Sequence, residues 1–330
     1  RLIRIYENNV NEDLINFMNK NMYELDVTDM RIAVLMGGPG SERPVSMASG
    51  AGVSKALTSC GAIVTEVDVR DADFILPDGV ELAFNVIHGT FGEDGQVQGI
   101  LEQRGVRYTG EGVLQSQMAI DKIATKRRLR ERGVPTADFE VIGVGDVPRL
   151  ELPFVLKAPK EGSSVGIYIL HHLSEIQPRL ADVRQYADEI LVEKFVKGRE
   201  LTVGILGEQA LPVVEIRPKE GFYDFKNKYP FLNPQAAGAD HFCPAPLDED
   251  VSREVQRVAL AAHRALGLQV YSRVDVLLDE KTGPSVLEIN TIPGMTPSSL
   301  LPEAAAAAGI SYADLCVRVI ALSLQRFSQS

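Results

Sequence analysis

The chain has 330 residues, 45% of them hydrophobic and 24% charged, which is ordinary for a globular protein with a sizeable core and two or three domains. Its formal net charge of −11 argues against nucleic acid or an anionic membrane as the main partner. Three widely separated cysteines, Cys60, Cys243 and Cys316, predict reduced thiols instead of a disulfide framework or a metal site. The sequence contains no apolar run of membrane-spanning length and no recognisable signal peptide, so composition predicts a soluble cytoplasmic enzyme.

Residues 1–29 differ from the rest of the chain because they are rich in Asn and contain neither Gly nor Pro. Met30 is followed by an apolar run typical of the first strand of an α/β domain. We therefore expect residues 1–29 to be an extension of unknown role, upstream of a natural start at Met30. The alternative is a genuine accessory helix. Deleting the extension is expected to leave activity intact.

From residue 31 onward, strand-like and helical patterns alternate. The strand-like runs lie at 32–36, 62–69 and 82–87, and the helical stretches at about 46–59 and 97–104. Strands that alternate with helices at this spacing predict a parallel doubly wound sheet. We assign it to an N-terminal α/β substrate domain that covers residues 30–115.

Two glycine-rich loops follow strand ends in this domain, where open α/β sheets bind ligands. The first begins at Gly37 and contains Glu42, whose carboxylate suits the ammonium group of an amino acid. A purely structural glycine turn is the alternative. The second loop covers residues 85–99 and contains His88, which could be either a hydrogen-bonding support or a proton carrier.

The sequence pattern of the next segment, residues 116–192, predicts a central lid domain. Lys122 lies at the start of a basic helix, facing whatever binds between this domain and the next. A strand that carries Lys157 is followed by a Gly/Ser loop at 162–166 and a second strand. Although no Walker A motif is present, Lys157 can reach phosphate oxygens, and the loop can close over a nucleotide.

A further strand ends in the sequence E-K-F-V-K-G-R-E, which starts at Glu193. An apolar strand with a carboxylate at its end suits an adenine and ribose pocket. Residues 193–196 would form the edge of this pocket, and Glu200 would lie at the ribose.

A predicted hairpin joins strand-like runs at 274–278 and 284–289 through the turn sequence D-E-K-T-G. Glu288 and Asn290 alternate along the second strand and point the same way, and the hairpin brings Asp275 alongside them. Three oxygen ligands on one face suit a hard cation such as Mg²⁺, whereas the alternative is a solvated polar face. The following loop, P-G-M-T-P-S-S, can bring backbone N–H groups close to a ligand.

Four motifs in this order carry a resemblance to a known family. They are H-G-x-x-G-E-D-G-x-x-Q-G at 88–99, E-G-S-S-V-G at 161–166, G-R-E-L-T-V at 198–203 and E-I-N-T-x-P-G-M-T at 288–296. From about residue 30 to residue 324 the chain resembles ATP-grasp ligases, and among them the D-alanine–D-alanine ligases. The resemblance implies a multidomain α/β fold of the ATP-grasp type. In it, the doubly wound domain and the central lid precede a C-terminal catalytic domain with an antiparallel sheet, at residues 193–330.

The resemblance also implies the nucleotide and metal ligands. ATP would lie between the central and C-terminal domains. Its expected ligands are Lys122, Lys157, Ser163, Glu193, Lys194, Val196, Glu200 and Lys228. Two Mg²⁺ or Mn²⁺ ions would be bound by Asp275, Glu288 and Asn290.

The resemblance implies that two D-alanines are joined through a D-alanyl phosphate, with release of ADP and phosphate, for peptidoglycan synthesis. Glu42 would bind the ammonium group of the first D-alanine, with His88 nearby. The remaining expected site residues are Arg273 and the Gly294 N–H at the oxyanion, Ser299 and Leu300 at the second carboxylate, and Tyr229, which would join Glu42 and Ser163 in a hydrogen-bonded group. A homodimer is usual for such ligases.

Some alternatives stay open at this point. Tyr229 replaces the His characteristic of relatives that use D-lactate and thus favours an amine, but D-serine or D-lactate remains the alternative second substrate. A non-catalytic paralogue would normally have lost a metal ligand or the oxyanion arginine. The departures from the family pattern are Pro39 and Pro44 in the first loop, Ala158 after Lys157, and a long loop after Tyr229. They bear on the conformation of the closing loop and on the substrate affinity, but they remove no catalytic residue.

Overall fold

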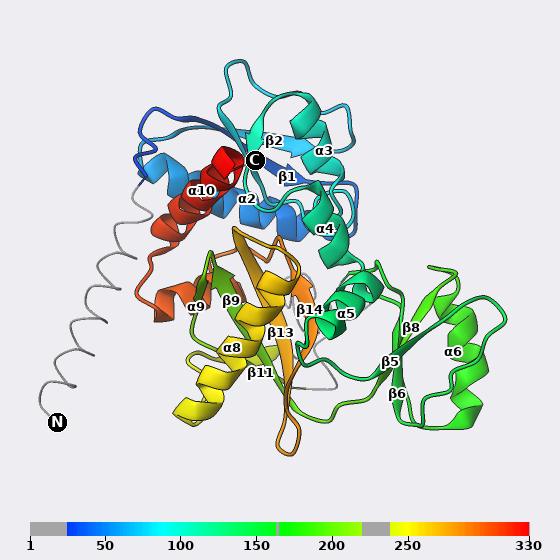
Figure 1. Ribbon diagram of the computed structural model, residues 1–330. Coiled ribbons are helices and arrows are strands. Elements are labelled where there is room, and N and C mark those ends of the chain that lie inside the picture. Colours follow the sequence, from blue (N-terminus) through cyan, green and yellow to red (C-terminus); the bar gives the residue numbers. More distant parts are fainter. Residues whose placement is uncertain (1–24, 163–164, 220–237, 330) are drawn as a thin grey trace, which may run out of the picture.

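The computed structural model describes residues 25–162, 165–219 and 238–329, which form three sheets that follow one another along the chain (Figure 1). We refer to the three sheets and their helices as the N-terminal, central and C-terminal units. In the described part of the chain no single helix has the length and apolarity needed to cross a membrane. The last two helices satisfy these criteria only as a pair bent by 103°.

The N-terminal unit is a parallel sheet with the strand order β2-β1-β3-β4. Its elements are β1 (Arg31–Gly37), α2 (Arg43–Ser59), β2 (Ile63–Val69), β3 (Leu82–Asn85), α3 (Gln96–Gln103) and β4 (Arg107–Tyr108). Alternate residues of β1 enter different cores, because Val34 packs on one face of the sheet and Leu35 on the other. A strand buried on both faces has a continuous apolar sequence, as β1 does. The predicted parallel sheet is confirmed.

Packing of the N-terminal unit begins before Met30. Val27 is 2% exposed and belongs to the same core as Leu57. The backbone N–H of Asp29 donates to the carbonyl oxygen of Gly61 over 2.9 Å. The expected start of the domain at Met30 therefore falls inside a packed segment, whereas residues 1–24 lie outside the described residues.

The central unit is an antiparallel sheet with the strand order β5-β8-β6-β7. Its elements are β5 (Phe139–Ile142), β6 (Phe154–Lys157), β7 (Ile167–Leu170), the 3₁₀ helix η1 (Leu173–Glu175), α6 (Ile176–Val183) and β8 (Ile190–Lys194). Leu180 and Val183 of α6 pack on Phe154, Leu156 and Val192 in a core that contains residues of this unit alone. The central unit is thus a separate packing body.

The C-terminal unit is a six-stranded sheet with the main order β12-β11-β9-β13-β14, and β10 pairs with β9. Its elements are β9 (Arg199–Leu206), β10 (Gln209–Ala210), β11 (Val214–Pro218), β12 (Ala239–Phe242), α8 (Glu249–Ala265), β13 (Tyr271–Asp279) and β14 (Gly283–Asn290). Helix α8 buries Val255, Val258, Ala259 and Ala262, which share one helical face, against this sheet. Acidic residues in its first turn and Arg264 in its last turn complement the helix dipole.

Helices connect the three units (Figure 1). α4 (Val113–Ile120) and α5 (Lys122–Glu131) lead from the N-terminal unit to the central one, and Asp121 caps α5 by accepting from two backbone N–H groups. α9 (Leu300–Ala307) packs on β9, and α10 (Tyr312–Gln329) returns to pack on α2 and β4. Residues of the N-terminal and C-terminal units therefore share one core.

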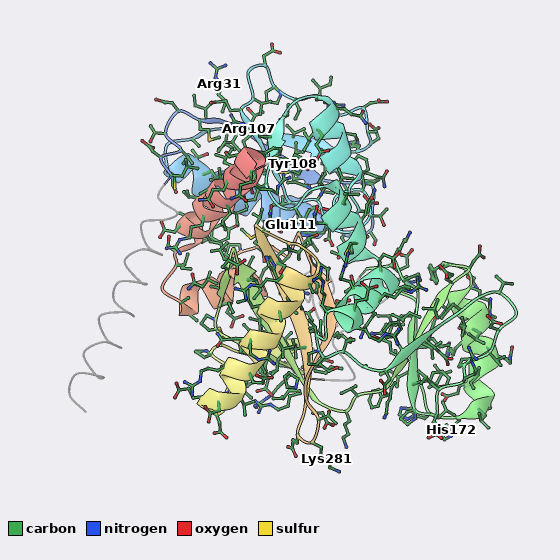
Figure 2. All side chains as sticks on the ribbon, in the orientation of Figure 1. Arg31, Arg107, Tyr108, Glu111, His172 and Lys281 are labelled. Atoms are coloured by element: carbon green, nitrogen blue, oxygen red, sulfur yellow. The ribbon has the colours of Figure 1, made fainter. Side chains whose placement is uncertain are left out.

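Glu111 lies where the N-terminal and C-terminal units meet (Figure 2). Its carboxylate is 2% exposed and accepts from the backbone N–H groups of Gln269, at 3.0 Å, and Val270, at 2.7 Å. Burial raises the pKa of Glu111 to about 7, and the backbone donors only partly oppose this rise. The carboxylate thereby attaches the segment before α4 to the chain that enters β13.

Candidate active site

A cavity of about 350 Å³ lies between the sheets of the central and C-terminal units. Val155, Ile167 and Ile169 form an apolar part of its wall, which suits a flat aromatic ring. Several of the expected nucleotide ligands line it, namely Lys122, Lys157, Glu193, Lys194, Val196 and Glu200, together with Asp275 and Glu288 of the hairpin. The fold thus brings together residues that are separated by more than 150 positions in the sequence.

Glu193 forms the centre of a buried ionic cluster in this wall. Its carboxylate is ion-paired to the ammonium groups of Lys126 and Lys157. All three side chains are buried: Glu193 is 2% exposed, Lys126 1% and Lys157 5%. Burial acts to raise the pKa of Glu193, but the charges of the two lysines outweigh this effect and hold it below its ordinary value. Glu193, expected at the base or ribose, therefore has its carboxylate engaged by two lysines.

Sequence reasoning missed Lys126. It follows Lys122 by four positions in α5, so both side chains lie on the same helical face, and this spacing was the available signal. Lys122 donates from Nζ to the carbonyl oxygen of Glu161 over 2.7 Å and lies 3.9 Å from Glu288 Oε2. Together with Lys157, these lysines make one side of the cavity suitable for a phosphate chain.

The hairpin of β13 and β14 forms with the expected pairing. Asp275 lies opposite Glu288, and Arg273 lies opposite Asn290, with a β-bulge next to Asp275. The proximity predicted for the two carboxylates is confirmed. Among the described residues no cluster of three or more His, Cys, Asp or Glu side chains could hold a metal, so an amide oxygen would have to complete the predicted set.

Asp275 is held by two neighbours. Its Oδ1 accepts from Thr202 Oγ1 at 2.6 Å and from Arg273 Nε at 2.9 Å, and its Oδ2 accepts from Arg273 Nη2 at 2.8 Å. Thr202 was not among the expected site residues, although it belongs to the G-R-E-L-T-V motif. The expected oxyanion arginine and an expected metal ligand thus form one bidentate pair.

Glu42 lies at the junction of two loops. A Cβ atom placed on Gly89 would come within 2.6 Å of Glu42 Oε2, and one placed on Gly162 within 3.2 Å. Gly89 also has a φ of +73°, which favours glycine. The carboxylate of Glu42 is therefore next to the residue that precedes Ser163, as the expected group with Ser163 requires. Ser163, Lys228 and Tyr229 lie outside the described residues.

His88 has hydrogen-bond partners at both ring nitrogens. Nδ1 lies 2.9 Å from the carbonyl oxygen of Ile292, which can only accept, so Nδ1 carries the proton. Nε2 then accepts from the hydroxyl of Ser49, which is 3.1 Å away. His88 is 4% exposed. Of the two roles left open by the sequence, these contacts favour the hydrogen-bonding support.

The loop after β14 leads into α9. Ser299 precedes the first helical residue, Leu300, whose side chain is buried. Ser299 Oγ accepts from the N–H of Thr296 over 3.1 Å, and a Cβ atom on Gly294 would approach it to 2.8 Å. The expected carboxylate ligands therefore lie at a helix N-terminus, where backbone N–H groups favour an anion.

Two sheets that enclose a cavity, with lysines on one side and a carboxylate hairpin on the other, define the ATP-grasp class of ligases. The sequence matches "D-ala D-ala ligase C-terminus" over residues 131–321 and "D-ala D-ala ligase N-terminus" over residues 71–111. The chain belongs to the D-alanine–D-alanine ligase family.

Relatives and solved structures cover most of the chain. A D-alanine–D-alanine ligase of Methylacidiphilum infernorum is 44% identical over 90% of this chain and 96% of its own length. One from Citrifermentans bemidjiense is 47% identical over 88% and 95%. The crystal structure of the ligase from Bacillus anthracis complexed with ATP superposes with a TM-score of 0.77, at 30% identity, over 91% of this chain and 99% of that chain.

Proposed function

We propose that this chain joins two D-alanine molecules into D-alanyl-D-alanine, consumes ATP, and thereby supplies peptidoglycan precursor synthesis. The observation that carries the proposal is the cavity between the central and C-terminal units, where lysines lie opposite the Asp275–Glu288 pair. Membership of the D-alanine–D-alanine ligase family over nearly the whole chain agrees with it.

The first half of the reaction activates a carboxylate, which resists nucleophiles because it is already negatively charged. Transfer of the γ-phosphoryl group of ATP to the first D-alanine makes a D-alanyl phosphate, whose phosphate is a good leaving group. Lys122 and Lys157 spread the charge of the transferred group, so the protein contributes positioning and electrostatics. Glu193, which also pairs with Lys126, holds Lys157 in place for this role.

The hairpin provides a ligand set for divalent cations. Asp275, Glu288 and Asn290 offer two carboxylates and an amide oxygen, which fit Mg²⁺ or Mn²⁺. Two such ions, when bound, would neutralise charge on the phosphate chain. The direct pairing of Asp275 with Glu288 across the strand ladder supports this assignment.

The second half of the reaction forms the peptide bond. Glu42 binds the ammonium group of the first D-alanine, and Ser299 with Leu300 binds the carboxylate of the second. The neutral amine of the second D-alanine attacks the acyl carbon, and phosphate leaves. Arg273 and the Gly294 N–H stabilise the oxyanion, where loss of one donor typically costs about 3 kcal/mol. The reaction requires a closed lid, because water would otherwise hydrolyse the acyl phosphate.

The proposal includes the organisation of the protein. Residues 30–115 form the substrate domain, residues 116–192 the lid, and residues 193–330 the catalytic domain. The family relationship favours a homodimer, and the requirement for ATP favours the cytoplasm.

The decisive experiment incubates the purified full chain with ATP, Mg²⁺ and D-alanine, alone or with D-serine or D-lactate. ADP release and the mass of the product are measured. D-alanyl-D-alanine as the main product is the expected result. If D-alanyl-D-serine or D-alanyl-D-lactate is the main product, the second substrate is D-serine or D-lactate instead of D-alanine. The absence of any product and of ADP release would favour a non-catalytic paralogue.

A further inference from the structure

The loop that carries Gly294 joins β14 to α9 without regular secondary structure. If the Gly294 N–H donates to the oxyanion, as the proposed function requires, the peptide group between Pro293 and Gly294 must be held in one orientation. Proline has no N–H of its own to anchor this loop. The orientation must therefore be set by the neighbouring peptide groups.

Both neighbouring peptide groups are held from the N-terminal unit. The carbonyl oxygen of Ile292 accepts from His88 Nδ1 over 2.9 Å. The N–H of Met295 donates to Ser49 Oγ over 3.2 Å. These two groups belong to the peptides immediately before and after the Pro293–Gly294 peptide. The peptide that presents the Gly294 N–H is thus fixed on both sides.

The two anchors are themselves linked in a single hydrogen-bonded chain. Ser49 Oγ lies 3.1 Å from His88 Nε2 and donates to it, because His88 Nδ1 carries the ring proton. The Ser49 hydroxyl can therefore accept from Met295 while it donates to His88. One arrangement of protons satisfies all three bonds, and such a chain is strengthened in a dry environment.

The surroundings make this chain rigid. Ser49 is 0% exposed and His88 is 4% exposed. Ser46, one turn before Ser49 in α2, accepts the backbone N–H of His88 over 3.0 Å. On the far side of the loop, the hydroxyl of Tyr312 donates to the carbonyl oxygen of Met295. The loop is thus clamped between helix α2 and helix α10.

We propose that Ser49 and His88 are positioning residues that orient the Gly294 N–H toward the oxyanion of the peptide-forming step. The inference rests on the proposed ligase function. It predicts that the Ser49 hydroxyl matters for bond formation between the two amino acids and matters little for phosphorylation of the first carboxylate, which uses the lysines and the hairpin.

The test compares Ser49→Ala with two controls. Ser49→Thr keeps the hydroxyl. Ser54→Ala removes another buried hydroxyl of α2, one for which the described residues offer no hydrogen-bond partner. Two rates are measured on each full-length variant: dipeptide formation, and exchange of the β,γ-bridging oxygen in ¹⁸O-labelled ATP, which reports reversible phosphorylation of D-alanine. The KM for ATP and the thermal unfolding midpoint are measured in parallel.

For Ser49→Ala, dipeptide formation is expected to fall roughly 10- to 100-fold, as for other misplaced catalytic groups. Oxygen exchange and the KM for ATP should stay within about twofold of the parent. Ser49→Thr should recover most of the lost rate, and Ser54→Ala should match the parent.

A Ser49→Ala variant that forms dipeptide at the parental rate, or that loses both rates in parallel, would overturn the proposal. If this variant does not fold, His88→Asn, which keeps a side-chain amide donor but breaks the link to Ser49, is judged by the same two rates. An inactive parent would instead contradict the proposed function.

Discussion

Arg273 donates two hydrogen bonds to Asp275, from Nε at 2.9 Å and from Nη2 at 2.8 Å. The two residues stand on the same strand, two positions apart, so their side chains share one face of the sheet. One of them is assigned to the oxyanion and the other to the metal ions. The pair therefore connects a proposed ligand of the metal ions at the ATP phosphates with the proposed oxyanion donor of the peptide-forming step.

This pairing predicts that Arg273→Lys is not a conservative change. A lysine keeps the charge but cannot reproduce the bidentate contact with Asp275. Dipeptide formation is expected to fall by at least about 100-fold, as after loss of an oxyanion donor. The KM for ATP should also rise, because Asp275 loses one of the two residues that hold it. Steady-state assays of ADP release and dipeptide formation measure both effects. An unchanged KM for ATP would show that Asp275 does not depend on Arg273.

Glu288→Ala is expected to abolish phosphate release with D-alanine and ATP while leaving the fold intact. The carboxylate is partly exposed and is assigned to the metal ions, so its loss removes a ligand without opening the core. Glu280→Ala, in the exposed turn of the same hairpin, serves as the matched control and should retain activity. Full activity of Glu288→Ala would contradict the metal assignment.

Glu193→Gln should destabilise the protein, because it removes the carboxylate that pairs with two buried ammonium groups. Breaking a buried ion pair typically costs about 3–5 kcal/mol. Since the pKa of Glu193 is depressed in the folded state, its stabilisation is present above its ordinary value of 4.5 and is lost as the pH falls below it. Urea unfolding at pH 7 and at pH 4 should therefore show a smaller difference between parent and variant at pH 4. If parent and variant differ by the same free energy of unfolding at both pH values, the depressed pKa of Glu193 is refuted.

The raised pKa of Glu111 predicts that stability depends on pH in the opposite direction. Its folded-state pKa of about 7 is higher than its ordinary value of 4.5, so the folded protein favours the protonated form. The associated stability is fully present below pH 4.5 and is lost as the pH rises through about 7. Between these values the free energy of unfolding should fall by at most about 1.4 kcal/mol per pH unit. In Glu111→Gln this fall should be absent. Urea unfolding at pH 5, 6 and 7 measures this dependence. If the free energies of unfolding of parent and variant change with pH in parallel, the raised pKa of Glu111 is contradicted.

Two truncated chains test how much residues 25–29 contribute to the stability of the protein. A chain that lacks residues 1–24 should keep the activity of the parent, and it serves as the reference because it retains Val27. A chain that lacks residues 1–29 should keep activity at 25 °C but lose about 1.5–3 kcal/mol of stability, because the burial of Val27 is removed. Equal unfolding midpoints for the two truncated chains would show that Val27 adds nothing.

Much of this architecture follows from the local sequence. The apolar run of β1, the glycine-rich turns after it and the D-E-K-T-G turn between β13 and β14 each specify their own conformation over a few residues. The alternation of Glu288 and Asn290 along one strand, with the turn that brings Asp275 alongside them, is sufficient to predict a shared face. The ordered motifs identified the family, since they extend over nearly the whole chain.

Tertiary structure alone decided which side chains meet across the units. Lys126 became a neighbour of Glu193 because α5 packs beside the central sheet, and the N–H of Met295 reached Ser49 across 246 positions of sequence. The partners of Glu111, just before β13, are determined by packing in the same way. Such contacts depend on how complete helices and sheets pack, and periodicity and turn chemistry act only over a few residues. The sequence by itself therefore determined the elements and the chemistry available, and packing determined which groups hold the catalytic ones in place.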